Sequence, residues 1–81
     1  MSDRDWMGIV IAAVAEETGV DPATLEPMTT AADVEGWDSL AHVRIVLNIE
    51  MRAGMTVDVD MTYGAATLAD LVDLLDAMAG E

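Results

Sequence analysis

Apolar residues recur at helical spacing in three stretches of the chain, which are separated by polar and glycine-containing segments. Such a stripe marks the face of a helix that packs on a core. The first stretch predicts a helix over about residues 4–18, with Asp3 able to cap its start and Gly19 suited to the left-handed residue after its end. Its expected core face consists of Trp6, Ile9, Val10, Ala13 and Val14.

The second stretch predicts a helix over about residues 39–53. Asp38 is a favoured N-cap, because its carboxylate can accept the free N–H groups of a first turn, and Gly54 is a favoured stop. Leu47 and Met51 are expected nearer the surface, where exposed apolar residues on one helix indicate a contact with a partner. The expected core face consists of Ile45, Val46 and Ile49, joined by Leu40 or Val43 one turn earlier.

The third stretch predicts a helix over about residues 68–79, opened by Thr67 and Asp70 as a capping box. Residues 59–64 leave room for one short helix between the second and third long ones. These segments predict an all-α fold, a small four-helix bundle with one domain over residues 1–81, three main helices and a short third one. The expected core face of the last helix consists of Leu68, Leu71, Val72, Leu75 and Met78.

Residues 19–38 lack a long periodicity and predict a loop that crosses one end of the bundle. Within it, Asp21 and Pro22 indicate the cap and first residue of one short helical turn. Methionines usually fill gaps in cores. The loop residues expected to point inward are Leu25, Met28 and Val34, and Met61 and Met78 are expected in the core as well.

Charge narrows the classes of function. Three basic residues against sixteen acidic ones give a net charge of −13. Such a chain lacks the cationic surface that nucleic acids and anionic membranes attract, so neither is expected as a partner. Basic protein surfaces are the expected partners, and mutual repulsion favours a monomer.

The remaining composition indicates a small soluble protein of the cytoplasm. There is no cysteine, which excludes disulfides and thiolate metal sites. No apolar run approaches the length of a membrane span, and the acidic N-terminus is unlike a signal peptide. Hydrophobic residues make up 53% of the chain, which is enough for one modest core.

Asp58 and Asp60 resemble the opening of a calcium-binding loop, but the comparison fails at two positions. The EF-hand pattern requires glycine at its sixth position and glutamate at its twelfth. This chain has Tyr63 and Ala69 at those places. No metal site is therefore predicted.

His42 follows Ser39 by about one helical turn, so the two side chains can share a face. A catalytic Ser–His pair would also need a group that orients the imidazole and an oxyanion pocket, and the sequence gives evidence of neither. The other interpretation is a surface histidine that contacts an arm or a partner beside Ser39. We expect no catalysis by the chain itself.

Ser39 stands in the run Gly36-Trp37-Asp38-Ser39-Leu40, where the second predicted helix begins. Asp-Ser-Leu at this place, in an acidic chain of this length, resembles the acyl carrier protein family, which includes the peptidyl and aminoacyl carriers. The resemblance covers nearly the whole chain and is strongest over residues 29–78.

The resemblance implies that Ser39 carries a covalent 4′-phosphopantetheine arm, whose terminal thiol holds the cargo as a thioester. A phosphopantetheinyl transferase would attach the arm, so the chain would be a substrate of that enzyme and not itself a catalyst. Asp38 matches the family's aspartate that helps the transferase coordinate its metal. Leu40 matches the hydrophobic contact that the transferase and later enzymes recognise.

The second predicted helix departs from fatty-acid carriers, whose exposed face is strongly acidic. Here it carries Arg44 and Arg52, and a reversed charge on a docking face selects against the wrong partners. Trp37 also resembles the residue found there in carriers of dedicated pathways. The residues expected to bind partners are Trp37, His42, Val43, Arg44, Leu47 and Met51.

The sequence therefore predicts a free-standing carrier that serves a polyketide, nonribosomal-peptide or aminoacyl-transfer pathway. Its partners would be the transferase, the acyl or aminoacyl ligase or acyltransferase that loads the cargo, and the downstream biosynthetic enzymes. The alternative is a non-covalent acidic helical module that docks basic partner proteins and carries nothing.

Overall fold

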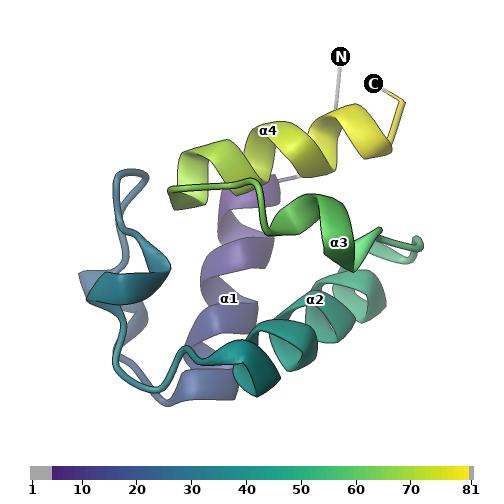
Figure 1. The fold of residues 1–81 in the computed structure, drawn as a ribbon. Coiled ribbons are helices and arrows are strands. Elements are labelled where there is room, and N and C mark those ends of the chain that lie inside the picture. Colours follow the sequence, from purple (N-terminus) through teal and green to yellow (C-terminus); the bar gives the residue numbers. More distant parts are fainter. Residues whose placement is uncertain (1–4, 81) are drawn as a thin grey trace.

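The computed structural model describes residues 5–80, which form four α-helices and two short 3₁₀ turns and contain no strand. The all-α fold predicted from the sequence is confirmed (Figure 1). None of the helices in this described part is long and apolar enough to cross a membrane. The α-helices are α1 (Trp6–Thr18), α2 (Ser39–Ala53), α3 (Val59–Thr62) and α4 (Leu68–Met78), and the 3₁₀ turns span Pro22–Thr24 and Ala31–Asp33.

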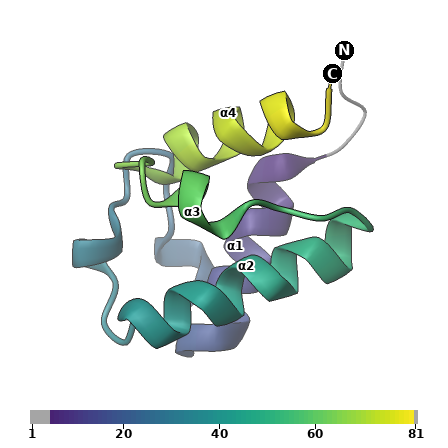
Figure 2. The ribbon, with the colours of Figure 1, turned by 45° about the vertical axis from the view of Figure 1, so that its right-hand side comes forward.

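The other two long helices pack on α1. It contacts both α2 and α4, and the short α3 lies between those two helices on one side of the bundle (Figures 1 and 2). The interior they enclose is apolar, and burying one aliphatic side chain stabilises such a fold by about 1.5–3 kcal/mol. The side chains with no exposed surface are Val10, Ala13, Val14, Ile45, Ile49 and Leu75.

Local cap residues set the ends of α1 and α2. Asp5 caps α1, because its carboxylate accepts the N–H of Gly8 at 3.0 Å. The expected cap, Asp3, lies outside the described residues, and the helix begins two residues later than predicted. Gly19 and Gly54 follow α1 and α2 in the left-handed conformation that glycine adopts without strain, with φ angles of 77° and 70°.

The buried face of α2 differs from the prediction in its first turn. Ala41 is 7% exposed and belongs to the core, whereas Leu40 is 61% and Val43 38% exposed. Ala41 stands four residues before Ile45 and therefore shares its face, while Leu40 and Val43 are turned toward solvent. Both apolar side chains are thus available for contacts outside the bundle.

Two of the methionines expected in the core lie at the surface: Met28 is 74% exposed and Met61 51%. Met28 stands in a turn closed by the Thr29 N–H, which donates to the Glu26 carbonyl at 3.0 Å. This turn uses its backbone to contact α4 and leaves the Met28 side chain outside. In α3 the buried residue is Thr62, and adjacent helical residues point about 100° apart, so Met61 faces away.

The loop over residues 19–38 is attached to α4 through its backbone. The carbonyls of Pro27 and Thr29 accept the N–H groups of Ala69 and Leu68 at 2.9 and 3.0 Å. These amides belong to the first turn of α4, where no partner exists within the helix itself. The contact satisfies the start of α4 and also fixes the loop that leads to Ser39.

Both 3₁₀ turns of this loop begin at polar residues. The Asp21 carboxylate accepts the N–H of Ala23 at 2.9 Å, in agreement with the predicted turn. The turn over Ala31–Asp33 was not predicted, although the Thr30 N–H donates to the Asp33 carboxylate at 3.1 Å, an arrangement typical of a helix start. The loop residues that are buried as predicted are Leu25 and Val34.

The predicted capping box of α4 forms in a shifted version. The Thr67 hydroxyl accepts the N–H of Asp70 at 3.2 Å, as expected. The Asp70 carboxylate accepts the N–H of Ala66 at 3.2 Å, one residue before the amide that a capping box would use. Of the predicted core face, Leu68, Leu71 and Leu75 are buried, and Val72 and Met78 are partly buried.

Candidate functional site

The turn before α2 presents Ser39 as the first residue of that helix. Gly36 bends the chain with a φ of 90°. Residues with a Cβ atom rarely adopt this conformation, whereas glycine adopts it without strain. Asp38 then caps the helix, because one of its carboxylate oxygens accepts the N–H of Ala41 at 2.8 Å. Its second oxygen makes no hydrogen bond to any of the described residues.

The Ser39 side chain is exposed, and its hydroxyl makes no hydrogen bond within residues 5–80. The positive end of the α2 dipole lies at this position, together with N–H groups of the first turn that have no partner within the helix. An accessible hydroxyl in this setting can be modified by another protein, and a phosphate attached to it would be stabilised electrostatically.

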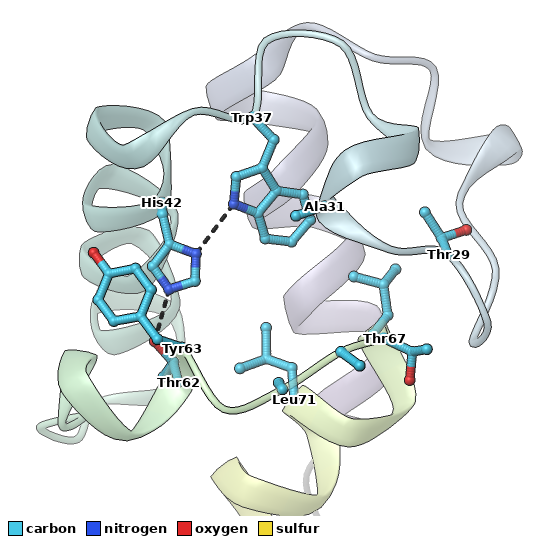
Figure 3. A pocket seen from close by; sticks show the side chains of 11 residues that line it. Thr29, Ala31, Trp37, His42, Thr62, Tyr63, Thr67 and Leu71 are labelled. Carbon is cyan, nitrogen blue, oxygen red and sulfur yellow. Dashed lines mark hydrogen bonds between the residues drawn. The ribbon is translucent and has the colours of Figure 1, made fainter.

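His42 does not form a catalytic pair with Ser39. Its Nδ1 accepts the indole N–H of Trp37 at 3.1 Å, and its Nε2 lies 2.7 Å from the Thr62 hydroxyl oxygen (Figure 3). Both ring nitrogens are therefore engaged, and neither is directed at the Ser39 oxygen. The arrangement lacks the proton acceptor that a serine nucleophile requires.

The imidazole of His42 is held in a partly buried aromatic setting. Its ring stacks on Tyr63 with 4.4 Å between centroids and 25° between planes, and it lies 6.0 Å from the centroid of Trp37. Burial removes water from the charged form and so lowers the pKa of His42 below its ordinary value of 6.5. The neutral imidazole is therefore the favoured form near pH 7.

A cavity of about 130 Å³ opens beside His42, between the 19–38 loop, α3 and the start of α4 (Figure 3). Trp37, His42 and Tyr63 form its aromatic side, and Leu68 and Leu71 form part of its aliphatic side. The same three aromatic residues line a shallower surface hollow that reaches Asp38 and Ser39. The exposed serine thus lies next to a small and largely apolar recess.

The apolar side chains expected to bind partners form an exposed strip on α2. Leu47 is 57% and Met51 78% exposed, as predicted, and they continue the line of Leu40 and Val43 along the helix. The strip begins at the residue after Ser39. Such a row of exposed apolar side chains on one helix is typical of an interaction surface.

The two arginines of α2 have different surroundings. Arg52 binds the Glu16 carboxylate of α1 at 2.7 Å and donates from Nε to the Asn48 side chain at 2.6 Å. The buried Asn48 in turn donates to Glu16 and Glu17 at 3.2 and 2.9 Å. Arg44 is exposed and has no ion pair among residues 5–80, so its charge remains available to a partner.

The described residues contain no group of three or more His, Cys, Asp or Glu side chains that could hold a metal ion. Asp58, which begins the segment resembling a calcium loop, serves as the N-cap of α3 and accepts the N–H of Asp60 at 3.1 Å. The Asp58 carboxylate therefore has a structural role in starting the short helix.

The sequence did not identify the partners of His42. Thr62 is 1% exposed, and its hydroxyl donates to the Val59 carbonyl at 2.6 Å while it contacts the imidazole. Tyr63 stacks on the other side of the site. No local pattern connects position 42 with positions 62 and 63, because they meet only when α3 packs beside α2.

Comparisons with known proteins agree with this site. The family described as "Phosphopantetheine attachment site" matches residues 9–75. An acyl carrier protein of Micrococcus luteus is 33% identical over 63 residues, which cover 78% of this chain and 78% of the relative. A non-reducing polyketide synthase, tazA, of Aspergillus terreus is 32% identical over 73 residues, or 90% of this chain.

The chain spans 3% of the length of that synthase, so the likeness concerns one small part of a much larger protein. No solved structure matches the chain.

Proposed function

The chain belongs to the family of phosphopantetheine-bearing carrier proteins, and from that premise we propose that Ser39 is the serine to which its 4′-phosphopantetheine arm is attached. The observation that carries this proposal is the exposed Ser39 hydroxyl, free of hydrogen bonds within residues 5–80 and placed at the first residue of α2. In a small acidic bundle, this is a hydroxyl that another enzyme can reach without unfolding the carrier.

In the attachment reaction the carrier supplies only the serine hydroxyl and its surroundings. The Ser39 oxygen would lose its proton to the transferase's base and form a phosphodiester bond with the phosphorus of the phosphopantetheine part, while the pyrophosphate bond of coenzyme A breaks and adenosine 3′,5′-bisphosphate leaves. A phosphopantetheinyl transferase would supply the metal and the base. The resemblance to the family implies that Asp38 helps that enzyme hold its metal, and one oxygen of its carboxylate makes no hydrogen bond to the described residues. The start of α2 favours the resulting negative charge through its dipole and its unengaged amides.

Once the arm is attached, its thiol holds a biosynthetic intermediate as a thioester. A tethered intermediate is presented at a high effective concentration to each enzyme that the carrier visits. The carrier's own residues provide the attachment point and the docking surface, while the chemistry of the cargo takes place in its partners.

We place the docking surface on the exposed face of α2. Leu40, Val43, Leu47 and Met51 supply apolar contacts, and Arg44 supplies a charge that no described residue neutralises. A positive charge at this point favours partners with an acidic residue opposite it and disfavours enzymes that have a basic surface there.

This surface supports a role in a specialised pathway, of the polyketide, nonribosomal-peptide or aminoacyl-transfer kind. The similarity to part of a polyketide synthase supports the first of these. The family match does not favour the alternative function, a non-covalent docking module.

Transfer of the arm tests the proposal directly. The chain is incubated with coenzyme A and a broad-specificity phosphopantetheinyl transferase, and its intact mass is measured. The wild type should gain the mass of one arm, and Ser39→Ala should gain none. Ser2→Ala is the matched control, because Ser2 is the other serine of the chain, and this variant should gain the arm like the wild type.

An unchanged mass in the wild type would contradict the assignment. Full modification of Ser39→Ala would contradict it as well, since the arm would then be attached elsewhere.

A further inference from the structure

The hydrogen bonds around His42 permit one arrangement of protons. The indole of Trp37 can only donate, so Nδ1 of His42 must accept and its hydrogen must be on Nε2. The Nε2–H then donates to the Thr62 hydroxyl at 2.7 Å, and this hydroxyl donates to the Val59 carbonyl at 2.6 Å. Every donor in this series of three hydrogen bonds has an acceptor, and the imidazole is neutral.

This chain of bonds connects three parts of the fold around Ser39. Trp37 lies two residues before the serine, His42 lies one turn after it, and Thr62 belongs to α3, which is twenty residues further along the chain. We call the bonds from Trp37 through His42 to Thr62 the clasp. Figure 3 shows its two bonds as dashed lines from the two nitrogens of the imidazole, with the ring of Tyr63 beside it.

We propose that His42 is a positioning residue for the modification of Ser39: in its neutral form it holds the turn that carries the serine against α3, and its protonation releases that turn. This inference rests on the proposed function, because it concerns how readily Ser39 is loaded. It gives the chain a pH-dependent response that needs no further ligand.

Protonation of His42 at Nδ1 is incompatible with the clasp. A proton taken from solvent by Nδ1 would place two donors, Nδ1–H and the indole N–H of Trp37, opposite each other. One bond of the clasp is then lost, and the indole must find an acceptor elsewhere. Losing this bond frees the turn before α2 from the imidazole.

Few charged groups near His42 could offset this effect. On its own element, Asp38 lines the same surface hollow, but its carboxylate is bound to the Ala41 N–H. Directly after α3, the titratable neighbour is Tyr63, whose ring stacks on the imidazole. From the loop and α4, the residues that line the adjoining cavity are uncharged, and they include Thr29, Ala31, Leu68 and Leu71.

None of the described carboxylates forms an ion pair with His42. Because burial lowers the pKa of His42 below its ordinary value of 6.5, the clasp is complete at pH 7.5 and opens only at a pH below that value.

A titration followed by NMR tests the clasp on the unmodified chain. As the pH is lowered through the His42 transition, the indole N–H signal of Trp37 and the amides of Ser39 and Thr62 should shift with the same midpoint as the imidazole. In His42→Gln these shifts should be absent, because glutamine offers a donor and an acceptor but is not protonated. Shifts of the same size in His42→Gln, or an indole signal that ignores the imidazole transition, would overturn the proposal.

A second variant removes the donor and keeps an aromatic ring. Trp37→Phe should raise the pKa of His42, because a donor no longer opposes the proton on Nδ1. An unchanged midpoint would show that the indole does not bond the imidazole and would overturn the clasp.

A competition assay tests the positioning role. Wild type and His42→Gln are mixed in equal amounts and loaded from coenzyme A by one transferase, so the pH dependence of that enzyme cancels. The ratio of loaded wild type to loaded variant should fall about two-fold or more between pH 7.5 and a pH below the His42 midpoint found by NMR. His42→Ala should load more slowly than His42→Gln at both pH values.

A ratio that does not change with pH would overturn the positioning role. Absence of loading in every chain would instead contradict the proposed attachment at Ser39, and the NMR titration would still decide whether the clasp exists.

Discussion

Single residues at the candidate site differ in how far their partners constrain them. Ser39 is exposed and its hydroxyl makes no hydrogen bond within residues 5–80, whereas both ring nitrogens of His42, one turn away, make hydrogen bonds. This difference agrees with the proposals that another enzyme modifies Ser39 and that His42 holds the turn beside it. The short distance in sequence between a serine and a histidine would suggest a catalytic pair, but the hydrogen bonds assign the histidine to a structural network.

His42 should make the stability of the fold depend on pH. Its pKa is lowered by burial in the folded chain, so the unfolded chain binds the proton more readily. The contribution of the neutral imidazole is complete above pH 6.5, the ordinary pKa, and is lost as the pH falls through the lower pKa of the folded state.

The urea midpoint of the wild type, compared with that of His42→Gln, should therefore decrease from pH 7.5 to pH 5.5. The difference between the two midpoints excludes the effect of the many carboxylates, because the wild type and the variant both contain them. Parallel midpoints over this range would show that burial does not change the pKa of His42.

At the scale of the elements, the features that could be predicted from the sequence are the helix ends that depend on nearby residues. Asp38 and Gly54 bracket α2, and Asp21 opens the first 3₁₀ turn, because caps and stops act through neighbouring amides. The second 3₁₀ turn also has a local signal, in Thr30 and Asp33, although this turn was not predicted.

Other features depend on residues far apart in the chain. The loop carbonyl of Thr29 meets the amide of Leu68, and His42 meets Thr62, only after the helices have packed. Periodicity assigns residues to a helix face, but it does not show which neighbouring element covers that face. For this reason Met28 and Met61, which are apolar and suited to a core, could be assigned to the interior and yet lie outside it.

The two arginines of α2 provide a test of which surface docks partners. Arg44→Gln and Arg52→Gln change the net charge equally, but only Arg44 lacks an ion pair among the described residues. Arg44→Gln should lower kcat/KM for loading by the cognate ligase or acyltransferase about five-fold, equivalent to about 1 kcal/mol. Its unfolding midpoint should decrease less than that of Arg52→Gln, because Arg44 has no ion pair among the described residues to lose.

Arg52→Gln should behave in the opposite way, with normal loading and a free energy of unfolding lower by roughly 0.5–1 kcal/mol, because Glu16 and Asn48 lose a partner. Equal loading rates for the two variants would mean that Arg44 is not part of the docking surface.

At the scale of the whole molecule, repulsion between negative charges opposes the stabilisation that a small core provides. The net charge is −13, and the radius of gyration is 11.3 Å. The molecule measures 32 × 23 × 21 Å, which is within about one Debye length at 0.01 M salt, where that length is roughly 30 Å, but exceeds the length of about 10 Å at 0.1 M salt. Self-repulsion of this kind destabilises the compact state, so the fold should depend on screening by ions.

Raising the NaCl concentration from about 10 mM to about 0.3 M should therefore raise the Tm of the wild type, because salt shortens the range of repulsion. The measurement is thermal unfolding followed by circular dichroism at constant pH. A Tm that falls or stays constant would indicate that local ion pairs, such as Arg52–Glu16, outweigh the general repulsion.

The most direct measurement of the central claim is a map of the attached arm by mass spectrometry. The three basic residues of the chain are Arg4, Arg44 and Arg52, so trypsin releases a peptide over residues 5–44 in which Ser39 is the single serine. After incubation with coenzyme A and a transferase, this peptide should carry the whole added mass, and fragmentation should assign it to Ser39. An unmodified 5–44 peptide, or added mass on any other residue, would contradict the account.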